Sequence, residues 1–252
     1  MEGLYSKVLS KSGQKISITL KAHKTLSIIE PICVHLQLKE NGQKSLKQNK
    51  INKRFVYLIS PNKIKSNEFY IDLEQVLNSK KVSFFQLRLK NETNRNMISI
   101  GKRIKKICKK YKVKFIINDN PIMAKKLNTD GCHLGQNDMN ILKAKKILKN
   151  KIIGVTCHNS LKLVQKAIND KASYIALGAF YSTKTKKVKY KASIKILNLA
   201  KKITNIPIVA IGGIKFDNYK KLLLNKANFL AISSYIWNNK KYKPLKAILK
   251  LK

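Results

Sequence analysis

The chain has 252 residues, of which 44% are hydrophobic, so it can bury a full core and is not disordered throughout. It contains no run of about 18 apolar residues, which excludes a helix that spans a membrane. The 54 Lys and Arg residues against 12 Asp and Glu residues give a net charge of +42 at pH 7, which attracts phosphate-bearing molecules.

The first 53 residues differ in character from the rest of the chain. They hold weak strand-like fragments at 16–20 and 32–38, and they end in a polar stretch, 39–53, that has little to bury. We therefore predict a basic N-terminal extension at 1–53, poorly ordered or loosely attached, followed by one catalytic domain at 54–252.

From residue 54 onward, short β-branched runs alternate with segments that have the period of a helix. The predicted strands are 55–60, 82–89, 113–119, 131–134, 152–158, 174–180, 206–212 and 229–235. The clearest predicted helices are 93–111, 141–149, 161–169, 194–203 and 218–225. Asn159 with Ser160, and Asp217, stand where helix caps belong. This count indicates an α/β protein with a closed parallel (β/α)8 TIM barrel. An open doubly wound sheet ranks second, since no GxGxxG sequence follows the first strand.

Polar residues or glycines stand at the ends of seven of the eight predicted strands. In chain order they are Gln86, Arg88 and Lys90; Asn118 and Asp119; His133, Gln136 and Asp138; Thr156 and His158; Thr183, Thr185 and Lys186; Gly212 and Gly213; and Ser233 and Ser234. The carboxyl ends of the strands in a parallel barrel meet on one face, where barrel enzymes keep their chemistry. The sequence therefore predicts one polar mouth that suits anionic substrates.

Four cysteines, Cys33, Cys108, Cys132 and Cys157, lie far apart and form no CxxC pair. In a chain of this size they predict reduced core or strand residues of a cytoplasmic protein. A disulfide framework or a cysteine metal site is not expected.

Seven segments of the chain carry a resemblance to a known family. They are FFQLRLKN, FIINDN, GCHLGQND, IIGVTCHN, ALGAFYSTKTK, IPIVAIGGI and FLAISS. In order and spacing they resemble the signature blocks of the thiamine-phosphate synthase (thiamine-phosphate pyrophosphorylase) family, within the thiamine monophosphate synthase/tautomerase superfamily. The resemblance covers residues 54–237 and implies the same (β/α)8 fold.

The activity that this resemblance implies is a group transfer. A transferase of this family joins 4-amino-2-methyl-5-hydroxymethylpyrimidine diphosphate to 4-methyl-5-(2-phosphoethyl)thiazole. The products are thiamine phosphate and pyrophosphate, and Mg²⁺ assists.

The resemblance also implies roles for the polar strand ends. Gln86, Arg88, Lys90 and Asn118 would bind the diphosphate, Asp119 and Asp138 would hold Mg²⁺, and Thr156, where the family usually has Ser, would contact the diphosphate or leaving group. Thr183, Thr185 and Lys186 would bind the substrates' phosphates, and the backbone amides of Gly212, Gly213, Ile232, Ser233 and Ser234 would surround the thiazole phosphate. Arg88, Lys90, Thr156 and Lys186 are the catalytic residues in this hypothesis.

The residue types suit this chemistry on physical grounds. The breaking carbon–oxygen bond leaves negative charge on the diphosphate, which Arg and Lys can neutralise. Mg²⁺ takes few carboxylates together with phosphate oxygens and water, so two aspartates on adjacent strand ends are an adequate supply. No protein nucleophile is required, and the sequence has no obvious Ser–His–Asp or Cys–His constellation.

Several of these residues also have a structural interpretation. Arg88 could be a structural ion-pair partner, and Asp119 could cap a helix that begins near Pro121. His133 could be a packed, hydrogen-bonded histidine, and His158 could be a base or could hold the turn after the fifth strand.

Three positions depart from the family pattern. Leu89 stands where an acidic or polar residue is usual, Asn120 where a charged residue is common, and Ala179 where Pro is frequent. These changes bear on fine substrate geometry and remove no named diphosphate or metal ligand.

Two other functions compete with the synthase. A thiazole tautomerase of the same superfamily needs a phosphate cradle and an acid–base group such as His158, but no apparatus for Mg²⁺ and diphosphate. A non-catalytic barrel that binds polyanions would use the basic charge, yet Arg is scarce and Lys is spread along the chain, which favours drift in composition. We expect small phosphorylated substrates, no specific nucleic acid and no membrane partner, and leave a homo-oligomer open.

Overall fold

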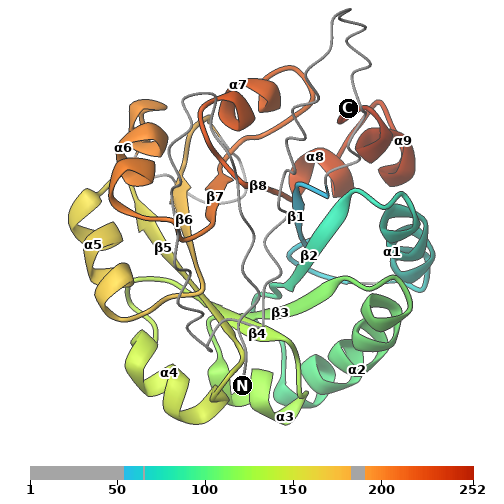
Figure 1. The fold of residues 1–252 in the computed structure, drawn as a ribbon. Helices are drawn as coiled ribbons and strands as arrows, with labels where there is room; N and C mark the ends of the chain where they lie inside the picture. The colour runs from blue at the N-terminus through green and yellow to red at the C-terminus, as the bar shows by residue number, and fades with distance from the viewer. Residues whose placement is uncertain (1–53, 65, 183–190) are drawn as a thin grey trace, which may run out of the picture. The chain divides into compact units, whose positions relative to one another are not determined.

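The computed structural model describes residues 54–64, 66–182 and 191–252, in which eight parallel strands close into a barrel (Figure 1). Each strand pairs with the next one in the chain, and β1 also pairs with β8, which closes the ring. The closed order confirms the predicted (β/α)8 fold and rules out the open doubly wound sheet. The extension predicted at 1–53 lies outside the described residues.

All eight strands begin within a few residues of their predicted starts. They are β1 (Val56–Ile59), β2 (Val82–Leu87), β3 (Lys114–Asn118), β4 (Gly131–Leu134), β5 (Ile152–His158), β6 (Tyr174–Gly178), β7 (Ile208–Ile211) and β8 (Phe229–Ile232). The prediction for the last strand was too long, because Ser234 already begins a helix.

Helices surround the barrel on its outside (Figure 1). They are α1 (Glu68–Asn78), α2 (Asn94–Lys110), α3 (Pro121–Lys126), α4 (Ile141–Leu148), α5 (Leu161–Asn169), α6 (Lys195–Ile203), α7 (Tyr219–Leu224), α8 (Ser234–Trp237) and α9 (Pro244–Leu249). The five clearest predicted helices correspond to α2, α4, α5, α6 and α7. Helices α1, α8 and α9 were not predicted.

Side-chain caps start four of these helices directly after the strand-end loops. The capping residues are Thr93, Asn120, Asn140 and Ser160, each of which accepts a hydrogen bond from the backbone N–H three residues on. The predicted cap at Ser160 is therefore confirmed. The predicted cap at Asp217 is wrong, because Asn218 directly precedes α7 and the Asp217 carboxylate instead pairs with Lys215 at 2.9 Å.

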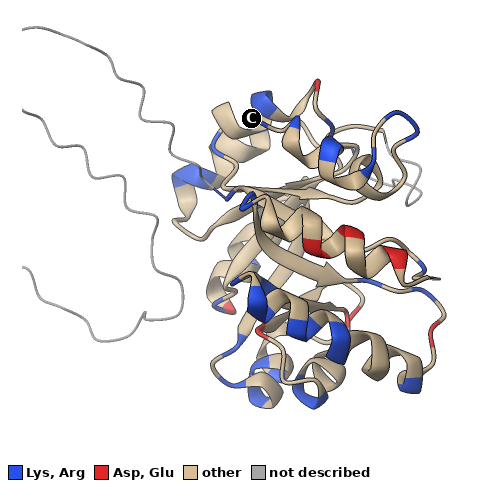
Figure 2. Cartoon of the chain, turned by 90° about the vertical axis from the view of Figure 1, so that its right-hand side faces the viewer, with Lys and Arg blue, Asp and Glu red and all other residues tan. Residues whose placement is uncertain are grey.

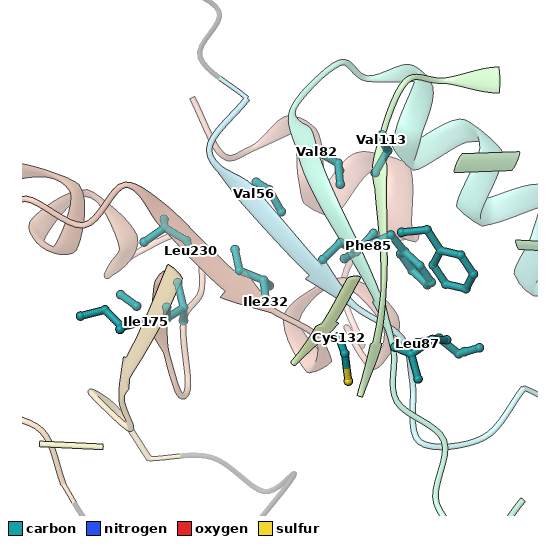
Figure 3. Packing of buried hydrophobic residues seen from close by; sticks show 14 of the residues in the cluster. Val56, Val82, Phe85, Leu87, Val113, Cys132, Ile175, Leu230 and Ile232 are labelled. Atoms are coloured by element: carbon teal, nitrogen blue, oxygen red, sulfur yellow. The ribbon is translucent and has the colours of Figure 1, made fainter. Parts of the chain in front are cut away.

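The strands bury both of their faces, in two separate apolar clusters. Side chains that point outward, such as Phe85 and Leu230, pack against the helices (Figure 3). Side chains that point inward, including Tyr57, Phe84 and Tyr174, fill the barrel itself. Burial on both faces explains why the strands read as almost continuous apolar runs, since alternation disappears when neither face meets water. The filled interior leaves the ends of the barrel as the place for chemistry.

Cys108, Cys132 and Cys157 are buried and form no disulfide, as predicted for reduced core residues, and Cys33 lies outside the described residues. Lys and Arg lie on several helices and loops of the side seen in Figure 2, so the charge is not confined to one element there. In the described part of the chain, no helix is both long enough and apolar enough to cross a membrane.

Candidate active site

The carboxyl ends of the strands carry the site residues that the structure describes. Gln86 pairs in register with Ile59, the last residue of β1, and Asn118 pairs with His133 of β4. Because the strands are parallel, these positions share one edge of the barrel. The described strand ends therefore meet on one face of the barrel, which we call the mouth, and Thr183, Thr185 and Lys186 lie outside the described residues.

Arg88 follows β2 and is held by the loop after β1. Its backbone N–H donates to the Ser60 hydroxyl at 2.9 Å, and its guanidinium Nη1 donates to the Asn62 side-chain oxygen at 3.2 Å. Among the described residues, no carboxylate lies within ion-pair distance of this guanidinium. The structural ion-pair interpretation of Arg88 therefore gains no support, and its remaining donors can serve an anion.

Gln86 at the end of β2 and Lys90 in the loop after it, on either side of Arg88, differ in exposure. Gln86 is only 2% exposed and points into the barrel near the Tyr57 hydroxyl. Lys90 has an exposed side chain, and its backbone N–H donates to the Asn62 carbonyl at 3.2 Å. The chain at and just after the end of β2 thus offers a buried amide at Gln86 and an exposed ammonium group at Lys90.

Two carboxylates come together where β3 and β4 end. Asp119 has a left-handed backbone with φ 61°, and its N–H donates to the His133 carbonyl at 2.7 Å. The Asn118 amide donates to the Asp119 carboxylate, and Asp138 accepts from the Gly135 N–H at 2.6 Å. The Asp119 and Asp138 side chains contact one another. The local turns therefore aim both carboxylates at the same point.

The contact between these carboxylates changes the acidity of one of them. The pKa of Asp119 is raised to about 7, first because its carboxyl group loses solvent and then because of the hydrogen bond and the like charge of Asp138. Arg88 and Asn118 act in the opposite direction, by attraction and by hydrogen bonding. The positive charge of Arg88 therefore lies close enough to attract the Asp119 carboxylate and lower its pKa.

Asp119 is not a helix cap. The side chain of Asn120 accepts the N–H of Met123 at 2.9 Å and so caps α3, with Pro121 at the first helical position. Asn120, a departure from the family pattern, therefore performs the capping role that was open to Asp119. The Asp119 carboxylate is left for the mouth.

Thr156 lies on β5 and makes one contact with β4 and one with the loop that follows β4. Its hydroxyl is 2.9 Å from Nε2 of His133, and its carbonyl accepts a hydrogen bond from the side chain of Gln136. Burial lowers the pKa of His133 to about 4, with Asp138 raising it and Arg88 lowering it further. His133 is therefore a neutral, packed histidine, as its structural interpretation predicted. His158 has a left-handed backbone at an irregularity between β5 and β6.

The loop after β7 depends on two glycines with positive φ. Gly212 has φ 106° and Gly213 has φ 62°, and a Cβ at either position would overlap atoms of the loop after β6, on Ala179 and Ser182 respectively. Asn218 stabilises this loop, because its side chain accepts from the Lys215 N–H at 2.9 Å and donates to the Gly213 carbonyl at 3.0 Å. The backbone of the loop after β7 therefore approaches the loop after β6 more closely than any residue with a Cβ would allow.

The end of β8 contributes backbone and one hydroxyl. The Ile232 side chain is buried in the outer cluster, so only its backbone can serve the mouth. The Ser233 hydroxyl donates to the Ser60 carbonyl at 3.1 Å, and Ser234 begins the short helix α8. The half of the mouth formed by β7 and β8 thus presents no charged side chain at the predicted positions.

A hollow beside the mouth lies outside the barrel. It runs between α4 and α5, and its lining includes Met139, Ile141, Leu163 and Lys166, with Asp138 on one side. It contains none of the predicted phosphate-binding residues. The strand ends are therefore a better candidate for the site than this hollow.

Comparison with known proteins agrees with this geometry. The model of the family "Thiamine monophosphate synthase" matches residues 56–236. A relative from Pelagibacter ubique, named thiamine-phosphate synthase, is 74% identical over 207 residues, which are 82% of this chain and all of the relative. The chain belongs to the thiamine monophosphate synthase family.

A more distant relative and a solved structure extend the comparison. A thiamine-phosphate synthase from Nitrosomonas eutropha is 39% identical over 158 residues, 62% of this chain and 74% of the relative. The solved structure of a thiamine phosphate pyrophosphorylase from Pyrococcus furiosus superposes with a TM-score of 0.70 at 28% identity, covering 79% of this chain and 94% of the other. The resemblance stated from the seven sequence segments is thus confirmed.

The carboxylates of this family member have the donor chemistry of a magnesium site. Among the described residues, no group of three or more His, Cys, Asp or Glu side chains is arranged so that it could hold a metal ion. Mg²⁺ does not need one, since one or two carboxylates with phosphate oxygens and water are its usual protein ligands. Loss of solvent is the main cause of the raised pKa of Asp119, and the like charge of Asp138 adds to it; a divalent cation beside both carboxylates would offset this repulsion. The residues therefore fit the ion.

Sequence reasoning missed the residues that hold Arg88 in place and the polar groups inside the barrel beneath the mouth. Ser60 and Asn62 hold Arg88, and the Tyr57 and Tyr174 hydroxyls lie inside the barrel, where the sequence offers only apolar strands. A tyrosine in an otherwise apolar buried strand was the available signal, because a buried hydroxyl requires a partner.

Proposed function

We propose that this barrel condenses 4-amino-2-methyl-5-hydroxymethylpyrimidine diphosphate with 4-methyl-5-(2-phosphoethyl)thiazole, giving thiamine phosphate and pyrophosphate. Membership of the thiamine monophosphate synthase family supports this reaction. The observation that carries the proposal is an Arg88 without a carboxylate partner next to the Asp119–Asp138 pair, within the described mouth. This combination suits a diphosphate together with a divalent cation.

The diphosphate would lie over the ends of β2 and β3. Arg88 offers the planar donor fork that matches phosphate oxygens, and exposed Lys90 adds a mobile positive charge. Gln86 and Asn118 would donate amide N–H groups from the barrel edge. The loop contacts of Arg88 with Ser60 and Asn62 reduce the entropy that binding must remove.

Asp119 and Asp138 would hold Mg²⁺ against the diphosphate. When bound, the ion would offset the charge that develops on the diphosphate oxygens. The two aspartates would hold the ion in their ionised forms, and because the pKa of Asp119 is raised to about 7, Asp119 must lose its proton for this role.

The thiazole phosphate would lie over the opposite half of the mouth. The backbone amides of Gly212 and Gly213 are accessible to a phosphate because no side chain covers them. Ile232, Ser233 and Ser234 would add amides from the end of β8. Thr183, Thr185 and Lys186 belong to this proposal by family resemblance.

The bond changes need no nucleophile from the protein. The carbon–oxygen bond to the diphosphate breaks and the electron pair leaves with pyrophosphate, while the aminopyrimidine ring stabilises the methylene cation. The thiazole nitrogen then forms the new carbon–nitrogen bond. Arg88, Lys90, Thr156 and Lys186 would stabilise the leaving group, so the protein contributes orientation and electrostatics. A cytoplasmic location and a homo-oligomer stay predictions.

The test is an assay of the purified full chain with both substrates and Mg²⁺. We expect thiamine phosphate and pyrophosphate in equal amounts, and no product without the divalent ion. Well-folded protein that forms neither product would overturn the synthase. Isomerisation of a thiazole carboxylate phosphate by that protein would establish the tautomerase instead, and salt-sensitive binding of polyanions alone would indicate the non-catalytic barrel.

A further inference from the structure

A line of hydrogen bonds crosses the inside of the barrel beneath the mouth. The Tyr57 hydroxyl of β1 is 2.7 Å from the Tyr174 hydroxyl of β6, which is 2.9 Å from Nδ1 of His133 on β4. Nε2 of His133 is in turn 2.9 Å from the Thr156 hydroxyl on β5. We call these four residues the interior relay. It joins the deepest polar group of the barrel to a residue of the proposed site.

The interior relay is tightly enclosed. Tyr57 and Tyr174 are each 2% exposed, and the His133 ring stacks on the Tyr174 ring with centroids 5.6 Å apart and planes at 16°. Gly154 of β5 makes room for Tyr174, since a Cβ at that position would overlap the phenol ring. Phe84 packs against Tyr57 with ring centroids 5.3 Å apart. The packing thus fixes where each hydroxyl lies.

The two hydrogen bonds of the His133 ring must run in the same direction along the interior relay. A neutral imidazole has one N–H donor and one bare nitrogen, so its two hydrogen bonds must have opposite sense. His133 is 9% exposed, lies between two hydroxyl groups and has no carboxylate within ion-pair distance among the described residues, which favours the neutral ring. If Nδ1 accepts from Tyr174, Nε2 must donate to Thr156. If Nδ1 donates, Thr156 must give its own proton to Nε2.

The two directions present different groups to a substrate. When Nε2 donates, the Thr156 oxygen is already an acceptor and its proton is free to point into the mouth. When Nε2 accepts, Thr156 turns its single proton inward and shows only lone pairs. A phosphate oxygen is attracted by the first arrangement and repelled by the second. The side chain of Gln86 lies next to the Tyr57 hydroxyl and can supply the donor that begins the first direction.

We propose that Tyr174 and His133 are positioning residues that hold the Thr156 hydroxyl as a donor toward the leaving diphosphate. This inference rests on the proposed function, in which Thr156 meets that group. Tyr57 supports the Tyr174 hydroxyl from the floor of the barrel. Neither tyrosine touches the substrate, so both act through Thr156.

A double-mutant cycle tests whether Tyr174 acts through Thr156. We expect Tyr174→Phe to lower kcat about fivefold to tenfold, the size of one hydrogen bond, with a smaller change in KM for the pyrimidine diphosphate. In the Thr156→Val background, the same substitution should leave kcat unchanged. An equal loss of kcat in both backgrounds would show that Tyr174 does not act through Thr156, and would overturn the proposal.

A matched control separates this effect from a loss of stability. Tyr219 is also buried, and its hydroxyl bonds to the backbone of Lys252, away from the interior relay. Tyr219→Phe should lower the melting temperature to a degree similar to Tyr174→Phe while kcat stays at the wild-type value. A kcat loss in Tyr219→Phe as large as in Tyr174→Phe would contradict the proposal.

The tautomer of His133 gives a readout that needs neither turnover nor a stable variant. Nitrogen-15 NMR of the imidazole in the wild-type chain with pyrophosphate and Mg²⁺ should show the proton on Nε2 and a bare Nδ1. A proton on Nδ1 would overturn the proposed direction. Wild-type protein that makes no thiamine phosphate would overturn the proposed function itself. An active wild type in which the effects of Tyr174→Phe and Thr156→Val on kcat are additive would overturn only the proposed role of the interior relay.

Discussion

The ends of β2, β3 and β4 bear charged side chains, whereas the ends of β7 and β8 bear glycine and serine. On the first side, Arg88 lies near the Asp119–Asp138 pair, in which burial and then the contact with Asp138 raise the pKa of Asp119. On the second side, Gly212 and Gly213 leave the backbone uncovered at positive φ. A diphosphate with a divalent ion calls for compensating charge, while a monophosphate can be held by amides. The two halves of the mouth therefore match two different phosphate groups.

The largest expected effect comes from removing charge on the first side. Asp119→Asn should lower kcat about 10²- to 10³-fold, since it weakens the hold on the divalent ion that would offset the negative charge developing on the diphosphate, and should leave the fold intact. Steady-state kinetics and circular dichroism would measure both. Normal activity in this variant would contradict the metal assignment.

Asp130→Asn is the matched control for that substitution. Asp130 lies before β4, at the other end of the barrel, where its carboxylate accepts the Phe115 N–H at 2.8 Å and pairs with Lys114 at 3.2 Å. The Asp130→Asn variant should be less stable than the wild type and should keep the wild-type KM for both substrates.

The next largest effect is expected from Arg88→Ala. The KM for the pyrimidine diphosphate should rise and kcat should fall, together lowering kcat/KM about 10²-fold, because a charged hydrogen bond to the leaving group is lost. The KM for the thiazole phosphate should stay within about twofold, since a group remote from that substrate contributes little to its binding.

Arg54→Ala controls for the loss of an arginine elsewhere. Arg54 donates to the Lys112 carbonyl at 3.2 Å, at the amino-terminal end of the barrel. A rise in the thiazole KM with Arg88→Ala, or no change in either parameter, would break the proposed division of the mouth.

The affinity for the divalent ion should depend on pH. The pKa of Asp119 is raised to about 7, so below that pH the carboxyl group must lose a proton before it can serve the ion. Affinity for Mg²⁺ should therefore rise by up to about tenfold per pH unit as the pH approaches 7, and then level off. Calorimetric titration with Mg²⁺ and pyrophosphate from pH 5.5 to pH 8.5, about 1.5 units on each side of 7, measures this affinity.

A flat dependence of the affinity over this range would contradict the coupling between the two carboxylates. Asp138→Asn sharpens the test, because it removes the like charge that raises the pKa of Asp119. The rise in affinity should then occur at lower pH, while the overall affinity falls.

The smallest expected effect concerns the second side of the mouth. Gly213→Ala places a Cβ at positive φ against the Ser182 carbonyl, so the loop must shift and its amides must move. We expect a KM for the thiazole phosphate that is raised about threefold to tenfold, with the diphosphate KM unchanged, and a stability loss of about 1–3 kcal/mol. Thermal unfolding and kinetics with each substrate varied in turn measure these changes.

Gly101→Ala is the matched control for that loop. Gly101 lies in α2, and a Cβ there would come within 2.5 Å of the Leu127 side chain. The substitution is similarly crowded, but it affects the packing of a helix and no residue of the mouth. It should destabilise the protein without changing either KM. An equal change in both KM values for Gly213→Ala would mean that the two halves of the mouth do not act separately.

Much of the fold was predictable because its signals are local. The apolar run Phe115–Ile117 and the period of Ile104, Ile107 and Cys108 each fall on one element, and the structure bears out both. Helix α1 has a comparable pattern at Phe69, Leu73 and Val76, although it was not among the predicted helices.

The short helices lacked such a signal. Helix α8 has four residues and α9 has six, which is less than two turns in each case. Their position is decided by packing, since the Trp237 indole donates to the Ile59 carbonyl at 2.6 Å and Ile248 is fully buried. No local period could have revealed those contacts.

Taken alone, the sequence determined the barrel class, the order of the strands, and the set of polar residues that follow them. These features depend on alternation, period and turn chemistry, which act over a few residues. Tertiary structure alone decided the rest: Asp119 meets Asp138, Asn120 takes over the cap, and Tyr57 bonds to Tyr174, 117 residues away. The physical reason is that barrel closure and register bring distant strands together, and burial then makes a partner for each polar group obligatory.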